Sequence, residues 1–357
     1  MIKKIFVTAA TVAAMSPLFA QETPAIEEPK PTIISGFVDA YFRYDFSQNA
    51  SNNRTSFTNS HNSFELGMAS VKLEHTMGKV GFVADLGFGK RAQEFAYNDN
   101  GITQAIKQLY VTYSPKDWLK LTMGSWATHV GYELVDAPAN RNYSMSYMFS
   151  WGPFFHTGIK AEATAGKSGF MLGVANQTDF KGSPTGAKKF MLAQYSLAAS
   201  DNVKFYLNYV GGQRADSGMS NQFDLVATAK LSDKFSVGYN GTVASVKDKS
   251  KAGLAAKAEA SSWWGSAVYL NLDPTDKFGI TLRSEYFSDK DQLVAMALAP
   301  EGGAIFANTI SMNFKAGPMT FIPELRFESS SKDAFYDKDG GSRSGNVSAL
   351  LAAIYKF

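Results

Sequence analysis

The chain has 357 residues, of which 45% are hydrophobic and 13% aromatic, and it contains no cysteine, which excludes disulfides and thiolate metal sites. Its 35 basic and 32 acidic residues give a formal net charge of +3. That charge is too small for the positive field that a nucleic-acid-binding protein needs.

The first 20 residues have the pattern of a signal peptide. Lys3 and Lys4 precede an apolar run from Ile5 to Met15, and a cleavage site follows at Ala20. An N-terminal membrane anchor is the alternative, but the run is short for a membrane span. Cleavage would remove two lysines and no acid, leaving a net charge of about +1. Residues 21–31 are rich in Pro and Glu and predict a flexible periplasmic leader.

From residue 33 onward, apolar and polar side chains alternate in segments of about ten residues, the length of a tilted transmembrane strand. In the first segment, Ile34, Val38 and Phe42 share one face, and Asp39 and Arg43 share the other. Sixteen such segments are predicted, at residues 33–45, 63–76, 79–90, 104–114, 118–126, 155–164, 168–177, 189–199, 203–213, 221–231, 235–245, 262–272, 278–288, 304–315, 319–329 and 346–357.

Two places interrupt this alternation, residues 63–76 and 246–262. In the first, the apolar face switches at Val71, which predicts a β-bulge there. No later apolar stretch is long enough for a transmembrane helix.

The connections alternate between short turns and long polar loops. The turns are rich in Gly, Pro, Asp and Asn, and the long loops include residues 47–62, 90–102 and 330–345. This asymmetry is typical of outer-membrane barrels. We therefore expect residues 32–357 to form an all-β, transmembrane, antiparallel up-and-down β-barrel with periplasmic termini. The number of strands should be about 16, within a range of about 14–18.

An open sheet edge is not viable in lipid, so the last segment must pair with the first. It ends with Tyr355 and Phe357, which share a face that we expect to contact lipid. A terminal aromatic residue of this kind resembles the signal that outer-membrane proteins present to the barrel assembly machinery.

A barrel of this size is too wide for its own side chains to fill, so we expect a water-filled channel. The candidate pore-wall residues are Asp39, Arg43, Asp85, Lys120, Lys160, Glu162, Asp224, Lys230, Arg283, Glu285, Glu324 and Arg326. The longest gap between strands, residues 127–154, would be the third outside loop. Its candidate constriction residues are His129, Glu133, Asp136, Asn140, Arg141 and Tyr143. The alternative is a loop that packs outside the barrel or on a partner.

Three short motifs carry a family resemblance: residues 131–133 (GYE), residues 140–144 (NRNYS) and residues 156–158 (HTG). With these motifs the chain resembles the OmpL-like β-barrel porins of the outer membrane, over residues 33–357. The resemblance implies a barrel with a porin role. It supplies no catalytic residues.

The expected function is passive diffusion of small hydrophilic solutes or ions across the outer membrane of a Gram-negative bacterium. The expected partners are outer-membrane lipid, the assembly machinery and the solutes, with no cofactor, metal or nucleic acid. A homotrimer stays open, since trimer contacts and lipid contacts use the same apolar face. A surface adhesin or structural barrel is the first alternative. A barrel hydrolase is the second, but none of the four histidines, at positions 61, 75, 129 and 156, lies in a hydrolase motif.

Overall fold

The computed structural model describes residues 31–247, 260–297 and 299–357. Sixteen antiparallel strands form a closed barrel in the order β1-β18-β15-β14-β13-β12-β11-β10-β9-β8-β7-β6-β5-β4-β3-β2. Their bounds are β1 Ile33–Asp45, β2 Ser63–Met77, β3 Val80–Phe88, β4 Ile106–Lys116, β5 Leu119–Ala127, β6 Phe155–Ala165, β7 Ser168–Ala175, β8 Phe190–Ala198, β9 Val203–Gln213, β10 Met219–Lys230, β11 Phe235–Lys247, β12 Ala260–Thr275, β13 Phe278–Asp289, β14 Gly303–Ala316, β15 Met319–Ser330 and β18 Gly345–Lys356.

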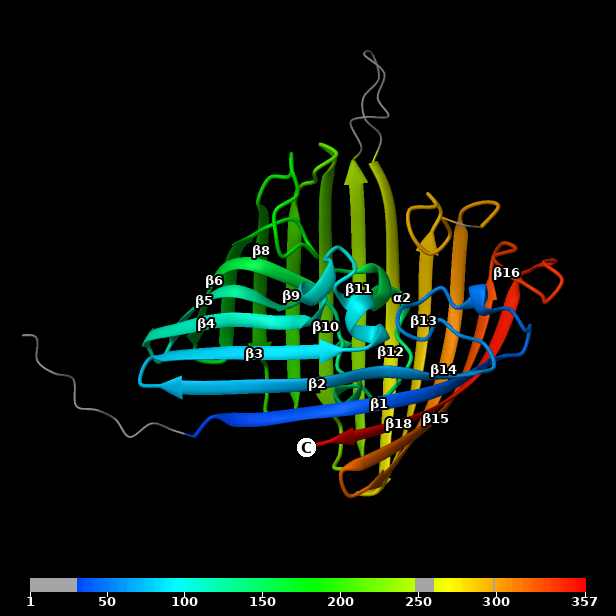
Figure 1. Ribbon diagram of the computed structural model, residues 1–357, viewed down its shortest axis with the longest axis horizontal. Helices are drawn as coiled ribbons and strands as arrows, with labels where there is room; N and C mark the ends of the chain where they lie inside the picture. Colours follow the sequence, from blue (N-terminus) through cyan, green and yellow to red (C-terminus); the bar gives the residue numbers. More distant parts are fainter. Residues whose placement is uncertain (1–30, 248–259, 298) are drawn as a thin grey trace, which may run out of the picture.

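The barrel confirms the predicted fold class and number of strands. In Figure 1 the strands of the near wall, β1 to β6, run across those of the far wall, β9 to β13, as strands tilted from a barrel axis do. A separate two-stranded sheet, β16 (Phe335–Tyr336) with β17 (Ser342–Arg343), lies in the loop between β15 and β18. The sequence alternation gave no signal for it.

Outward and inward side chains differ along each strand. On β14, Phe306 and Ile310 are exposed on the outside, whereas Thr309 and Ser311 are fully buried on the inside. This is the reverse of a soluble protein, and it follows from lipid on one face and polar groups on the other.

The last strand closes the sheet onto the first, as predicted. Val38 of β1 lies opposite Tyr355 of β18. The backbone of Phe357 continues the ladder, since its N–H donates to the carbonyl of Gly36 at 3.0 Å. Both side chains, Tyr355 and Phe357, are exposed on the outer face. Both ends of the barrel sequence therefore lie at one end of the barrel.

That end also carries the short turns, and we call it the short-turn end. Gly78, Gly166 and Gly317 occupy turns there with φ of 55°, 59° and 61°. Glycine reaches this left-handed region at no steric cost, so the predicted turn chemistry accounts for these three connections.

The opposite end of the barrel, the long-loop end, carries the long connections. In the ranges that the structure describes, these connections contain two short α-helices, α1 (Lys90–Phe95) and α2 (Tyr147–Trp151), of which α2 lies inside the barrel (Figure 1). Short 3-10 helices lie at Ala50–Asn52, Gly101–Ala105 and Ala137–Ala139.

Among the described residues, no helix has the length and apolar character needed to cross a membrane.

The bulge predicted at Val71 is in the wrong position. The register of β1 with β2 shifts between Val38 and Ala40, so Asp39 lies opposite Gly67 and Met68. The bulge frees the amide of Met68 from the strand pairing, and this amide donates instead to the Asp39 carboxylate at 3.0 Å. The predicted signal peptide, and the predicted leader apart from Pro31, lie outside the described residues.

Candidate functional site

The third loop, residues 128–154, joins β5 to β6. Its base is closed by the amide of Thr128, which donates to the carbonyl of Phe154 at 2.9 Å. Asn140 folds the middle of the loop, because its side chain accepts from the Leu134 amide at 2.9 Å. Ser146 caps α2 by accepting from the amide of Phe149 at 3.1 Å. The loop is thus a built element whose conformation its own polar residues hold.

Arg283 of β13 is the main contact of the third loop with the far wall. Its guanidinium lies 2.6 Å from the carboxylate of Glu133 and donates to the carbonyl of Ser144 at 2.7 Å. Arg283 and Glu133 have exposed side-chain fractions of 0% and 4%. An ion pair removed from water in this way needs both partners, because either charge alone would be left uncompensated.

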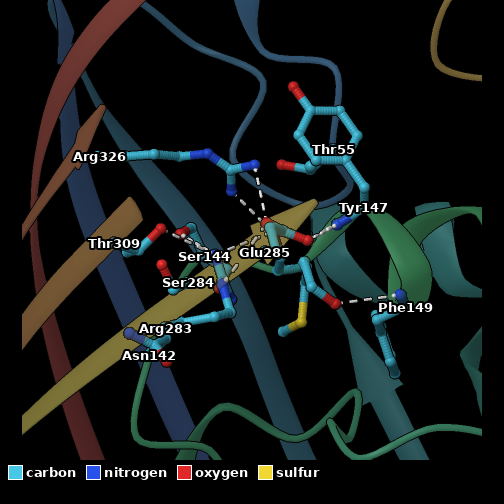
Figure 2. Close-up of polar contacts among 12 residues, drawn as sticks. Thr55, Asn142, Ser144, Tyr147, Phe149, Arg283, Ser284, Glu285, Thr309 and Arg326 are labelled. Carbon is cyan, nitrogen blue, oxygen red and sulfur yellow. Dashed lines mark hydrogen bonds and ion pairs between the residues drawn. The ribbon is translucent and has the colours of Figure 1, made fainter. Parts of the chain in front are cut away.

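Glu285, also on β13, collects a second set of contacts. Figure 2 shows Arg326 of β15 and Tyr147 of α2 approaching its carboxylate from opposite sides. Arg326 lies 3.3 Å from it, and the amide of Tyr147 donates to it at 2.9 Å. The hydroxyl of Tyr147 donates in turn to Glu328 at 2.7 Å. The N-terminal turn of α2 is therefore fixed to the wall by carboxylates.

The same loop contacts the opposite wall. The hydroxyl of Tyr143 donates to Asp39 of β1. Arg91 of α1 donates to the carbonyl of Val135 at 3.1 Å, and its guanidinium lies 4.6 Å from the centroid of the Tyr143 ring.

Lys107 of β4 adds an ionic contact at this wall. Its ammonium lies 2.6 Å from Asp136 of the third loop and 3.1 Å from Asp85 of β3. The third loop therefore bonds to inward-facing residues on both sides of the barrel.

The beginning of the loop follows the wall from β9 to β12. His129 hydrogen-bonds to the carbonyl of Tyr209 at 3.1 Å, and the amide of Gly131 donates to Asp224 at 3.0 Å. The rings of Tyr132 and Tyr269 stack with centroids 4.0 Å apart.

Residues 141 and 142 bond to the half of the wall toward the short-turn end. Arg141 pairs with Asp273, two residues before the end of β12. Its carbonyl accepts from Asn313 at 2.9 Å, and Asn142 donates to Ser311 at 2.7 Å. These bonds connect the middle of the third loop to the part of the barrel wall near the short-turn end.

Cavities lie on both sides of the third loop. The larger one, of about 820 Å³, is at the long-loop end and is lined in part by residues 150–154. Two smaller ones, of about 290 and 280 Å³, are both lined by residues 139–141. The second of these reaches Gly317 and Lys356 at the short-turn end. Within the described part of the chain, the loop thus lies between an outer cavity and these two inner ones.

Burial sets the protonation of the loop side chains. It lowers the pKa of His129 to about 4, assisted by the nearby charge of Lys160, so this imidazole is neutral at pH 7. Burial raises the pKa of Tyr143 and of Tyr147 well above the usual value. Both phenols therefore remain protonated and donate to carboxylates.

The structure brings five of the six candidate loop residues against the wall, namely His129, Glu133, Asp136, Arg141 and Tyr143. Asn140 instead bonds to the backbone of its own loop. Its side-chain amide therefore stabilises the fold of the loop, although Asn140 also lines both inner cavities.

The twelve candidate wall residues are split into groups. Those that bond directly to the third loop are Asp39, Asp224, Arg283, Glu285, Glu324 and Arg326. Asp85 acts through Lys107, and Arg43 pairs with Asp45 at 3.1 Å. Lys120 and Lys160 both pair with Glu162, and the exposed Lys230 pairs with Asp233 beside a short turn.

Sequence reasoning missed several residues of the network. Glu328 could have been found, because it alternates with Glu324 and Arg326 along β15 and so shares their face. Arg91 and Lys107 gave no signal, since Arg91 lies in a loop and Lys107 at the start of a strand. Their importance follows only from their burial beside Asp136 and Tyr143.

The comparisons with known proteins agree with this architecture. Residues 31–357 match the family described as "Putative beta-barrel porin-2, OmpL-like". The fold is similar to that of the outer membrane channel DcaP of Acinetobacter baumannii, with 13% identity, coverage of 91% of this chain and 97% of that one, and a TM-score of 0.62. It is also similar to the anion-selective porin from Comamonas acidovorans, with 11% identity, coverage of 92% and 100%, and a TM-score of 0.61.

The comparison with curated proteins gave no significant match. The family match spans the described barrel from end to end, and the structural likeness at low identity supports the same fold. The chain therefore belongs to the OmpL-like family of β-barrel porins of the outer membrane.

Proposed function

We propose that the barrel is a water-filled channel for passive diffusion of small hydrophilic solutes or ions, and that the third loop narrows it. The observation that carries the proposal is the set of bonds from this loop to opposite walls, from Arg283 on one side to Asp39 on the other. A loop held in this way reduces the cross-section that a solute can use, and its fixed charges set a local field.

A structural barrel or adhesin is the second candidate function. The observation that favours it is the same network, because a loop bonded to so many strands fills much of the interior. The cavities of about 290 and 280 Å³ below the loop and about 820 Å³ above it favour the channel, since they leave space on both sides.

Planar-bilayer recording of the refolded barrel separates the two functions. Stable ohmic current steps support the channel, and silence across many insertions supports the structural barrel. Deleting about ten residues from Ala137 to Ser146 then tests the constriction. The deletion should raise single-channel conductance, and an unchanged conductance would show that the loop does not limit the passage.

We also propose export by a signal peptide cleaved after Ala20, and assembly as a homotrimer. One of the similar solved structures, OmpT of Vibrio cholerae with 10% identity and a TM-score of 0.58, is described as a trimer form. N-terminal sequencing of the mature protein tests the cleavage site. Native mass spectrometry in detergent tests the trimer, and a single mass of one barrel would contradict it.

A further inference from the structure

The wall of the outer cavity carries apolar side chains where the lumen of a diffusion channel would carry polar ones. Val210, Gln222, Ala244 and Trp263 lie opposite one another across β9, β10, β11 and β12, and all four line the outer cavity. Three of these four neighbours are apolar, so one side of the cavity is an apolar wall.

The next inward row, two residues deeper, is polar. It contains Asn208, Asp224 and Thr242, again opposite one another. On β9 to β11 the apolar wall is therefore confined to the outer cavity. The loop between β13 and β14 extends it with Leu293 and Val294.

The other side of the cavity carries charges of both signs. Arg54 donates to the carbonyl of Ala295 at 2.9 Å and to that of Ala334. Glu94 accepts from the amide of Phe57 at 2.7 Å and from Asn59 at 3.1 Å.

Asp179 is the third charged group of the cavity. It accepts from the amides of Phe154 and Phe155 at 2.7 and 3.0 Å and from the hydroxyl of Tyr97 at 3.1 Å. Burial raises its pKa to about 6, so it is ionised at pH 7. Neutral groups thus hold Arg54, Glu94 and Asp179, and no ion pair within the described chain includes them. The fourth charged residue of the cavity lining, Arg214, is instead paired with Asp216.

Trp151 and Tyr97 give this side exposed aromatic faces. Their exposed fractions are 38% and 56%, and the indole N–H of Trp151 is already engaged, since it donates to the carbonyl of Arg54 at 3.1 Å. An aromatic face next to carboxylates suits an ammonium group.

We propose that the outer cavity is a binding site for a small zwitterionic solute with an apolar body, such as an apolar amino acid or short apolar peptide. The apolar wall takes the body, Arg54 attracts the carboxylate, and Glu94 with Asp179 attracts the ammonium. The volume of about 820 Å³ lies within the range of small-molecule sites. The site rests on the proposed channel function and makes that channel selective at its outer entrance.

Isothermal titration calorimetry of the full barrel in detergent tests the site with four matched probes. They are L-phenylalanine, phenylpropionate without the ammonium, phenethylamine without the carboxylate, and glycine without the apolar body. L-Phenylalanine should bind saturably, and each of the other three about tenfold or more weakly, as expected for the loss of one charge-assisted or apolar contact. Equal binding of all four, or no binding of L-phenylalanine, overturns the proposal.

Variants assign the binding to this cavity. Arg54→Gln and Glu94→Gln should each weaken L-phenylalanine binding about tenfold, and Trp151→Ala should weaken it severalfold. The matched controls, Arg343→Gln and Glu301→Gln, lie on the exposed surface and should leave binding unchanged. Heat-modifiable gel migration verifies that each variant still forms a barrel. Wild-type affinity in all three cavity variants places the binding elsewhere and overturns the proposal.

Bilayer recording keeps this proposal separate from the channel function. Current steps without calorimetric binding would support the channel and overturn the binding site. Binding without current steps would support the binding site and overturn the channel.

Discussion

Arg283 and Glu133 form a buried ion pair, 2.6 Å between guanidinium nitrogen and carboxylate oxygen, that joins strand β13 to the third loop. Removing one partner of this buried pair is costly, because the charge of the other partner then stays out of water without a counter-charge. The pair is therefore expected to control how firmly the loop is held.

Arg283→Met should release the loop. Loss of one partner of a buried pair costs about 3–5 kcal/mol, so we expect higher single-channel conductance and more current noise. Adding Glu133→Gln should recover part of the docking, since it removes the orphaned charge. Lys230→Met, at an exposed pair, is the control. Wild-type conductance in Arg283→Met would contradict this role.

The pair of Arg141 with Asp273 should matter less for stability and more for the inner passage. Both side chains are about one-third exposed, at 33% and 28%, and such pairs contribute about 0.2–1 kcal/mol. Arg141→Ala and Asp273→Ala should each alter conductance in the same direction, while the double variant matches the singles. Additive effects in this double-mutant cycle would show that the two residues act independently.

Acid should loosen the third loop at His129. The pKa of this residue is lowered from 6.5 to about 4 by burial, so between these values the undocked state binds a proton that the docked state does not. Stability is therefore full above about pH 6.5 and falls as the pH drops toward 4, by on the order of 3 kcal/mol. The nearby charge of Lys160 adds to the penalty for a charged ring at His129.

Limited proteolysis of the third loop from pH 7 to pH 4 measures this effect. His129→Gln keeps a donor for the carbonyl of Tyr209 and should flatten the pH dependence. His75→Gln, on an exposed part of β2, is the matched control. An unchanged pH profile in His129→Gln would assign the acid effect to other groups.

The terminal aromatic residue should serve assembly more than stability. Phe357 is 57% exposed on the outer face, so its removal leaves no cavity in a packed core. We expect Phe357→Ala to lower the fraction of heat-modifiable barrel in cells while the purified barrel keeps its unfolding midpoint. An equal loss of both would indicate a structural role instead.

The fold could be predicted from the sequence because lipid and lumen impose opposite demands on successive residues. Each of the sixteen expected segments overlaps one observed strand. The bulge of β2 was misplaced because Gly67 and Ala69 are small and carry no clear signal of which face they occupy. Its position is set by the Asp39 carboxylate on the neighbouring strand, which alternation within one segment does not report.

The site was less accessible to sequence reasoning. The alternation of side chains along each strand identified charged wall residues such as Arg283 and Glu324, because it fixes which residues face the interior of the barrel. It could not pair them with the loop, because the bond from Arg283 to Glu133 spans 150 positions. The role of Arg91 depends on the fold of two loops against each other, for which no local pattern exists.

The contacts of the third loop also constrain the order of folding. Tyr143 bonds to Asp39 of the first strand, and its amide bonds to Glu324 near the end of the chain. A segment in the middle of the sequence whose partners lie near both termini cannot be completed until the sheet has closed. Closure of the barrel and completion of the third-loop contacts are therefore coupled.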